Sequence, residues 1–185
     1  MRAVYIAEFG SSDNLEIREV PDLPKPLGAQ VLVRVRAAGL NRADLLQVRG
    51  AYPPPTGYSP NIPGLEFAGK VVAVGEGVKT WTIGDRVFGI TAGEAQAEFI
   101  LTDETLLARI PDGLDFAKAA AVPEAFITAH DAIFTLGNLR HGQHWQAAME
   151  GIRACVAKNE QAMGVKAPSS PRISVGAGVA DLRVF

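Results

Sequence analysis

The residues with the clearest chemical potential in this sequence follow an apolar run in its first third. The stretch "NRADLLQVRGAYPPP", residues 41–55, comes directly after the strand-like "QVLVRVRAAG" and holds Asn41, Asp44 and Tyr52. An Asn amide can both donate and accept hydrogen bonds, and a Tyr offers a flat apolar face with one hydroxyl. The three prolines at 53–55 restrict the backbone and are expected to hold the tyrosine in place. The pattern indicates an oriented polar rim at the end of a strand.

Each of these side chains has a structural alternative. Asn41 could simply satisfy backbone groups at the strand end, and Tyr52 could be a packing residue under the proline-rich loop. Asp44 is more often a turn or helix N-terminal residue than a catalyst, because short acidic side chains suit those positions. Gly75 and Gly77 favour a tight turn over a phosphate loop, since no helix pattern opens after them. No catalytic residue is assigned from the sequence.

The elements that must position these groups are short strands over the first hundred residues. Val31, Val33 and Val35 fall on one face of a period-two pattern, which is the signature of a half-buried strand. Five similar runs are separated by Gly and Pro clusters, as in "PDLPKPLGA" and "GEGV". Many short strands at close spacing predict a barrel or sandwich and not a doubly wound sheet.

The pattern changes to helical spacing near Asp115. The segment is rich in Ala and places Phe126, His130 and Ile133 at i, i+4 and i+7. Pro123 is expected to end one helix or to lie in the first turn of the next. Gly137 is a plausible C-cap.

Composition narrows the classes of partner. The formal net charge is −2, so no basic surface of the kind that binds nucleic acid is expected. The longest apolar runs are far shorter than the roughly 18–20 residues of a membrane span. A single cysteine, Cys155, excludes an internal disulfide framework. These features predict a cytoplasmic protein with neither a nucleic-acid nor a membrane partner.

Several segments together carry a resemblance to a known family. They include "VLVRVRAAGLNRADLLQVRGAYPPP", "IPGLEFAGKVVAVGEGV" and "IPDGLDFAKAAAVPEAFITAHDAIF", in family order from Met1 to about Gln143. The chain resembles the medium-chain dehydrogenase/reductase superfamily and, within it, the zinc-free quinone oxidoreductases such as zeta-crystallin. The resemblance implies a mainly β fold with α elements: a GroES-like β-barrel catalytic domain over residues 1–123. Residues 124–143 would then begin the connection to a Rossmann domain that binds NAD(P)H.

The resemblance also bears on metal binding. Zinc-dependent relatives hold their catalytic metal with a Cys where this chain has Asn41 and with the His of a Gly-His-Glu motif. That motif reads Gly64, Leu65 and Glu66 here. Leucine cannot ligate zinc and Asn is a poor ligand compared with thiolate or imidazole. The four clustered cysteines of the structural zinc site are absent as well, so no metal site is expected, and Glu66 should have a structural hydrogen-bonding role.

The implied chemistry is quinone reduction with NADPH. Without a Lewis acid to polarise an alcohol, alcohol oxidation is disfavoured, whereas a quinone is already a strong hydride or electron acceptor. By resemblance, Asn41 and Tyr52 face the cofactor cleft, and Thr128 matches a position at the start of the helix that lines the cofactor. These three are the candidate cofactor-binding residues. Family members are homo-oligomers, but the usual dimer-forming domain is not found here.

The family pattern stops near His144. Where the family continues with a buried strand and a Gly-rich phosphate turn, this chain reads "HWQAAMEGIRACVAKNEQAM". Residues 144–185 are therefore expected to be a tail outside the family, with one amphipathic helix followed by irregular structure. A shifted reading frame, an alternative splice or a gene-prediction error would each produce it. The Rossmann domain would be missing or only begun, and the truncated chain as given is expected to be inactive.

Three functions compete on this reading. The first is an NAD(P)H-dependent quinone oxidoreductase by resemblance. The second is a non-catalytic truncated barrel that acts as a binding or regulatory module. The third is a zinc alcohol dehydrogenase, which Asn41 and Leu65 disfavour.

Overall fold

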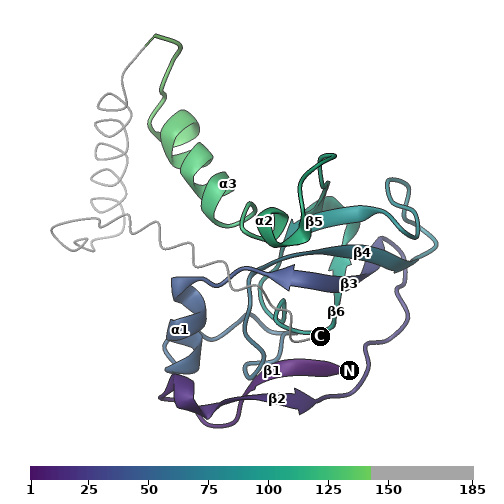
Figure 1. Ribbon diagram of the computed structural model, residues 1–185, viewed down its shortest axis with the longest axis vertical. Helices are drawn as coiled ribbons and strands as arrows, with labels where there is room; N and C mark the ends of the chain where they lie inside the picture. The colour runs from purple at the N-terminus through teal and green to yellow at the C-terminus, as the bar shows by residue number, and fades with distance from the viewer. Residues whose placement is uncertain (143–185) are drawn as a thin grey trace, which may run out of the picture. The chain divides into compact units, whose positions relative to one another are not determined.

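A computed structural model describes residues 1–142 of the chain (Figure 1). The chain divides into two compact units. Of the described residues, Met1–Glu124 belong to unit 1 and those from Ala125 onward belong to unit 2. The expected tail at residues 144–185, with its helix, lies outside the described residues.

Unit 1 is built mainly of antiparallel strands. Its larger sheet has the order β6-β3-β4-β5-β7, and Figure 1 shows β3 and β4 side by side. This agrees with the predicted mainly β fold and excludes a parallel, doubly wound arrangement for these strands. The five strands are β3 (Gln30–Ala38), β4 (Glu66–Val74), β5 (Arg86–Ile90), β6 (Phe99–Asp103) and β7 (Leu107–Arg109).

Strand β3 is the strand on which the sequence pattern is clearest. Val31 and Val33 are fully buried and Val35 nearly so, while Arg34 and Arg36 on the opposite face of the strand are exposed. The buried set packs with Phe67, Val71, Val87 and Trp81 in one cluster. Burying a side chain of this size contributes about 1.5–3 kcal/mol relative to leaving it in water. The period-two prediction for this strand is confirmed.

The pairing of β3 with β4 is irregular at two places, between Leu32 and Val33 and between Val35 and Ala37. Gly69 of β4 lies opposite Val35. A Cβ atom at Gly69 would come within 2.2 Å of the Arg34 carbonyl oxygen. Bulges of this kind increase the local twist of a strand pair, and the missing side chain allows the two backbones to approach closely.

The turn after β4 is formed by glycines, as expected. The Gly75 N–H donates to the Gln30 carbonyl (2.8 Å) and the Gly77 N–H to the Gly28 carbonyl (2.9 Å). A Cβ at Gly75 would lie 2.4 Å from the Gly28 oxygen. No helix opens after this turn before β5 begins, so the prediction of a tight turn and not a phosphate loop is confirmed.

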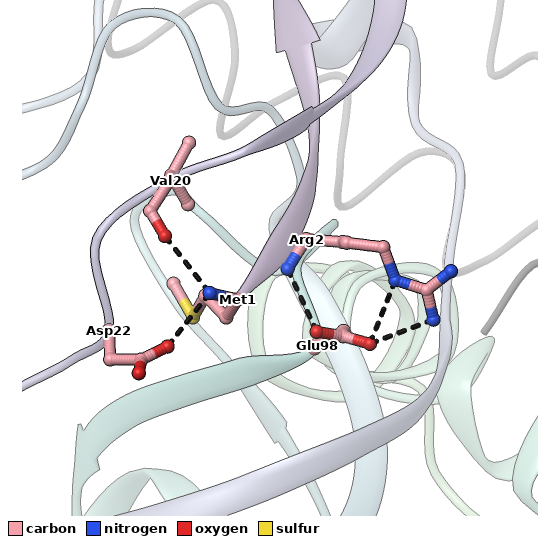
Figure 2. Close-up of polar contacts among 5 residues, drawn as sticks. All are labelled: Met1, Arg2, Val20, Asp22 and Glu98. Carbon is pink, nitrogen blue, oxygen red and sulfur yellow. Dashed lines mark hydrogen bonds and ion pairs between the residues drawn. The ribbon is translucent and has the colours of Figure 1, made fainter.

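A separate two-stranded sheet forms the start of the chain. Strand β1 (Arg2–Ile6) pairs antiparallel with β2 (Leu15–Glu19). The segment that connects the two strands contains the short 3-10 helix η1 (Ser12–Asn14). Figure 2 shows how the sheet is anchored: Arg2 meets Glu98 through its backbone N–H (2.8 Å) and its guanidinium (2.9 Å). The Met1 ammonium donates to the Val20 carbonyl and to Asp22.

Short helices complete unit 1. Helix α1 (Arg42–Val48) follows β3 directly, and η2 (Glu104–Leu106) precedes β7. Helix α2 (Phe116–Ala120) begins after Asp115, whose side chain accepts from the Lys118 N–H at 2.8 Å. Its buried Ala119 and Ala120 pack with Ala37, Ala68 and Ile110, which attaches α2 to the sheet.

Unit 2 begins with helix α3 (Ala125–His130), which continues as the π-helical segment η3 (Asp131–Leu136). Pro123 lies between α2 and α3, as predicted. Gly137 is the C-cap of η3 and donates to the Ala132 carbonyl at 2.9 Å. Within residues 1–142, no helix has the length and apolar character needed to cross a bilayer.

Candidate functional site

Asn41 occupies the junction between β3 and α1. It has extended backbone angles and precedes the first helical residue, so it is the N-cap of α1. Its backbone N–H donates to the Asp44 carboxylate at 2.8 Å, which is the return half of a capping box. Its side-chain amide donates to Oε1 of Glu66 at 2.9 Å. The side chain therefore ties the start of α1 to the start of β4.

Glu66 is the first residue of β4 and is 3% exposed. Besides the bond from Asn41, its second carboxylate oxygen accepts from the Glu124 N–H at 2.9 Å. Burial raises the pKa of the Glu66 carboxyl, and the charges of Glu124 and Asp44 raise it further; the hydrogen bonds from the Glu124 N–H and Asn41 act in the opposite direction. The expected structural hydrogen-bonding role of Glu66 is confirmed.

Asp44 is the second buried carboxylate of the site. One of its oxygens accepts from the Gly64 N–H at 3.1 Å, and the other accepts from the side chain of Gln96 at 3.4 Å. Burial raises the pKa of Asp44, while the bonds from Asn41 and Gly64 lower it. Asp44 thus joins the first turn of α1 to the two loops that carry Gly64 and Gln96, in agreement with its interpretation as a helix N-terminal residue.

Two further groups brace this arrangement. Gln47 on α1 is buried and donates to the carbonyls of Pro60 (2.9 Å) and Ile62 (3.3 Å). Gly64 has a φ of +110°, and a Cβ there would lie 2.6 Å from the Gln96 backbone nitrogen. Only glycine adopts such an angle readily, so the backbone geometry at position 64 requires a glycine directly before Leu65.

The other candidate residues lie apart from these bonds. Tyr52 follows α1 and is 43% exposed, and Thr128 lies in α3 of unit 2. Within residues 1–142, no hydrogen bond links either side chain to the carboxylates of Asp44 and Glu66. Their assignment to the cofactor stays a prediction.

Sequence reasoning missed four participants: Gly39, Gln47, Gln96 and Glu124. A Cβ at Gly39 would lie 2.1 Å from Oε1 of Glu66, so glycine leaves the space that the carboxylate fills. Glu124 takes part through its backbone N–H, which no side-chain pattern reveals. Gln96 lies 52 residues from its partner in the chain. A glycine two residues before Asn41 is the one local signal in the sequence.

The donor set of this site suits hydrogen bonding. Both carboxylates face N–H donors, and Leu65 between Gly64 and Glu66 is buried. In the described part of the chain, no three His, Cys, Asp or Glu side chains gather as a metal site would require. Zinc prefers thiolate and imidazole ligands in tetrahedral geometry, whereas the groups gathered here are two carboxylates, a carboxamide and backbone N–H groups.

Comparison with known proteins defines the class. The model of the alcohol dehydrogenase GroES-like domain matches residues 28–132, more than half of the chain. The chain belongs to this family, and its relatives include quinone oxidoreductases and VAT-1-like proteins of the medium-chain dehydrogenase/reductase superfamily. This confirms the superfamily and the GroES-like fold expected from the sequence.

Individual relatives match only in part. The mouse synaptic vesicle membrane protein VAT-1 homolog-like is 40% identical over 144 residues, covering 77% of this chain and 34% of that protein. The quinone oxidoreductase of Lama guanicoe is 34% identical over 160 residues, covering 84% and 48%. A mycobacterial structure complexed with NADPH has a TM-score of 0.67 at 30% identity, covering 77% and 43%.

The chain thus spans about a third to a half of the length of these relatives. The alignment with the Lama guanicoe protein covers a larger share of the chain than residues 1–143 contain. The boundary placed at His144 therefore stays a prediction.

Proposed function

We propose that the chain carries the catalytic-domain part of an NADPH-dependent quinone oxidoreductase with a zinc-free cleft. The observation that carries this proposal is the network at the altered zinc motif, in which Asn41 is bonded to Glu66 beside the buried Leu65. The likeness to a quinone oxidoreductase and to a structure complexed with NADPH supports the same assignment.

The chemistry divides between cofactor and protein. Bound NADPH supplies the hydride, and the protein supplies binding, orientation and a dry pocket. Asn41 is suited to orientation, because Glu66 fixes the rotation of its carboxamide and leaves it part-buried. Tyr52, exposed in the loop before the prolines, offers a ring face for packing against a planar ligand. Thr128 on α3 is the third residue proposed to contact the cofactor, through its hydroxyl.

The chain by itself is proposed to be inactive. Asn41, Tyr52 and Thr128 are assigned only to the nicotinamide end, whereas the pyrophosphate of a dinucleotide usually rests on N–H groups at a helix N-terminus. Poor positioning of the hydride donor removes most of the rate advantage of an enzyme. A steady-state assay with NADPH and 1,4-benzoquinone tests this, and turnover on the order of 1 per second or faster would contradict it.

A second candidate is a non-catalytic binding module, which the exposure of Phe126, Ile127, Phe134 and Leu136 in unit 2 favours. Joining residues 1–142 to the rest of the cofactor domain of a related quinone oxidoreductase keeps Thr128 and these exposed side chains, and it separates the two functions. The quinone-reductase proposal expects turnover in that chimera. A folded chimera that binds NADPH but does not reduce quinones would favour the binding module.

The same chimera tests Tyr52. Replacing Tyr52 by Ala should raise the Michaelis constant for quinone or NADPH about two- to tenfold, because an aromatic contact contributes about 0.5–1.5 kcal/mol beyond its area. Tyr52→Phe is the matched control and keeps the ring contact. Equal kinetics for Tyr52→Ala and the parent would assign Tyr52 to packing alone.

A further inference from the structure

Glu66 is hydrogen-bonded to two segments of unit 1 that are far apart in the chain: the start of α1 and the residue that precedes α3. Its carboxylate accepts from the side chain of Asn41 at 2.9 Å and from the backbone N–H of Glu124 at 2.9 Å. We propose that Glu66 is a positioning residue, which sets the orientation of the Asn41 carboxamide and fixes the last residue of unit 1 before α3 begins.

The surroundings leave room for the Glu66 side chain. Gly39 leaves the space, since a Cβ there would lie 2.1 Å from Oε1, 2.5 Å from Cδ and 2.6 Å from Cγ of Glu66. The Gly39 N–H also donates to the Glu66 carbonyl at 3.2 Å. Glycine at position 39 therefore leaves free the space that the Glu66 side chain fills from Cγ to Oε1.

Both neighbours of the carboxylate are N–H donors. An ionised carboxylate accepts from both, whereas a Gln amide has one accepting oxygen and one donating NH₂ group. A Gln at position 66 would therefore keep one bond and set its NH₂ group against the other donor. The charges of Asp44 and Glu124 raise the pKa of the Glu66 carboxyl, and the two bonds that its oxygens accept come from N–H donors.

The contact with Glu124 lies at the end of unit 1. Helix α3 starts at the next residue, Ala125. The first N–H groups of a helix have no partner within the helix. The bond to Glu66 gives the N–H just before these groups a buried acceptor. Glu66 thus determines where the backbone leaves the β domain, and this holds whether or not the chain reduces quinones.

Amide hydrogen exchange followed by NMR tests the inference on the full 185-residue chain. In the wild type, the Glu124 N–H should exchange at least about tenfold more slowly than the N–H groups of Ala125 and Phe126, since these are open first-turn donors. Exchange of Glu124 as fast as these neighbours would overturn the inference without any substitution being made.

A polarity swap gives the sharper test. Glu66→Gln should speed exchange at Glu124 about tenfold or more, because the amide competes for its two donors. In the double variant E66Q/N41D, the NH₂ group introduced at position 66 would donate to the new carboxylate at position 41, and the amide oxygen would accept from Glu124. This variant should return the exchange rate to within about threefold of the wild type.

The single variant Asn41→Asp completes the cycle. It places two carboxylates where an amide and a carboxylate now stand 2.9 Å apart, so it should be less stable than the double variant. Failure of N41D to relieve E66Q, with both proteins folded by circular dichroism, would assign Glu66 to packing and overturn the positioning role.

Discussion

Replacing Gly39 by Ala tests the tight fit around Glu66. The added methyl carbon would lie 2.1 Å from Oε1 of Glu66, far inside the 3.0 Å below which real Cβ contacts are essentially never found. The nearest atoms belong to a buried side chain held at both oxygens. The carboxylate must therefore leave its site and lose its bonds to Asn41 and Glu124.

The magnitude follows from these bonds. A hydrogen bond to a charged group contributes about 1.5–3 kcal/mol, so losing both costs roughly 3–6 kcal/mol. A Gly-to-Ala change also restricts the unfolded chain, which returns about 0.4–1 kcal/mol where the backbone angles are compatible. The expected net destabilisation is about 2–5 kcal/mol, a large part of the roughly 5–15 kcal/mol that typical domains have.

Urea denaturation measures this difference directly, as a shift in midpoint at constant slope. Gly93→Ala is the matched control, because a Cβ there would meet Tyr58 at 3.3 Å, a contact that a small shift relieves. The variant Glu66→Ala should cost much less in the Gly39→Ala background than in the wild type, since the bonds are already gone. Simple additivity of the two changes, or a cost of Gly39→Ala within about 0.5 kcal/mol of zero, would refute the reasoning.

Three further outcomes are expected. Gly64→Ala should lower the unfolding free energy in the same assay by about 2 kcal/mol or more, because the new side chain meets the Gln96 backbone at a φ of +110°; a smaller loss would show that the loop adjusts. The Arg109 guanidinium lowers the pKa of Asp85 below 3.8, so the stability that Asp85 adds is present above that pH and is lost as the pH falls through the lowered value. The difference in unfolding free energy between wild type and Asp85→Asn should therefore become smaller as the pH falls, which urea titrations between about pH 2 and 6 would measure. A difference that does not change with pH would show that the ion pair does not stabilise the fold. Elemental analysis should find no stoichiometric zinc, since by resemblance Asn41 and Leu65 take the places of a Cys and a His ligand, and neither is a good zinc ligand; about one tightly held zinc per chain would contradict this.

The strands are the most predictable part of the fold. Alternation alone is enough for β3, because one face is buried throughout and the other carries arginines. Strand β7 has three residues, too few for a periodic signal. Helix α1 has seven residues and begins directly at the end of β3, so its start is visible in the sequence only as a polar stretch.

The candidate site is predictable in its residue types but not in its connections. Asn41 and Glu66 stand out because, by resemblance, they lie in the segments that hold the catalytic zinc of related enzymes, but the bond between them was not predicted. The bond from the Glu124 N–H spans 58 residues and depends on where the backbone passes. A local sequence pattern does not encode a contact between residues so far apart in the chain.

The anchoring of β1 has a consequence for the newly made chain. Ala3 bridges to Ala97, and Arg2 binds Glu98, 96 residues later. Ribosomes add about 5–20 residues per second, so β1 is made roughly 5–20 seconds before Ala97 and Glu98 are added to the chain. A two-stranded hairpin is marginally stable by itself, and Ala3 and Ile6, fully buried in the finished fold, would stay exposed during that interval. Strand β1 can therefore take its final place only late in the synthesis of the domain, although it precedes these partners in the chain.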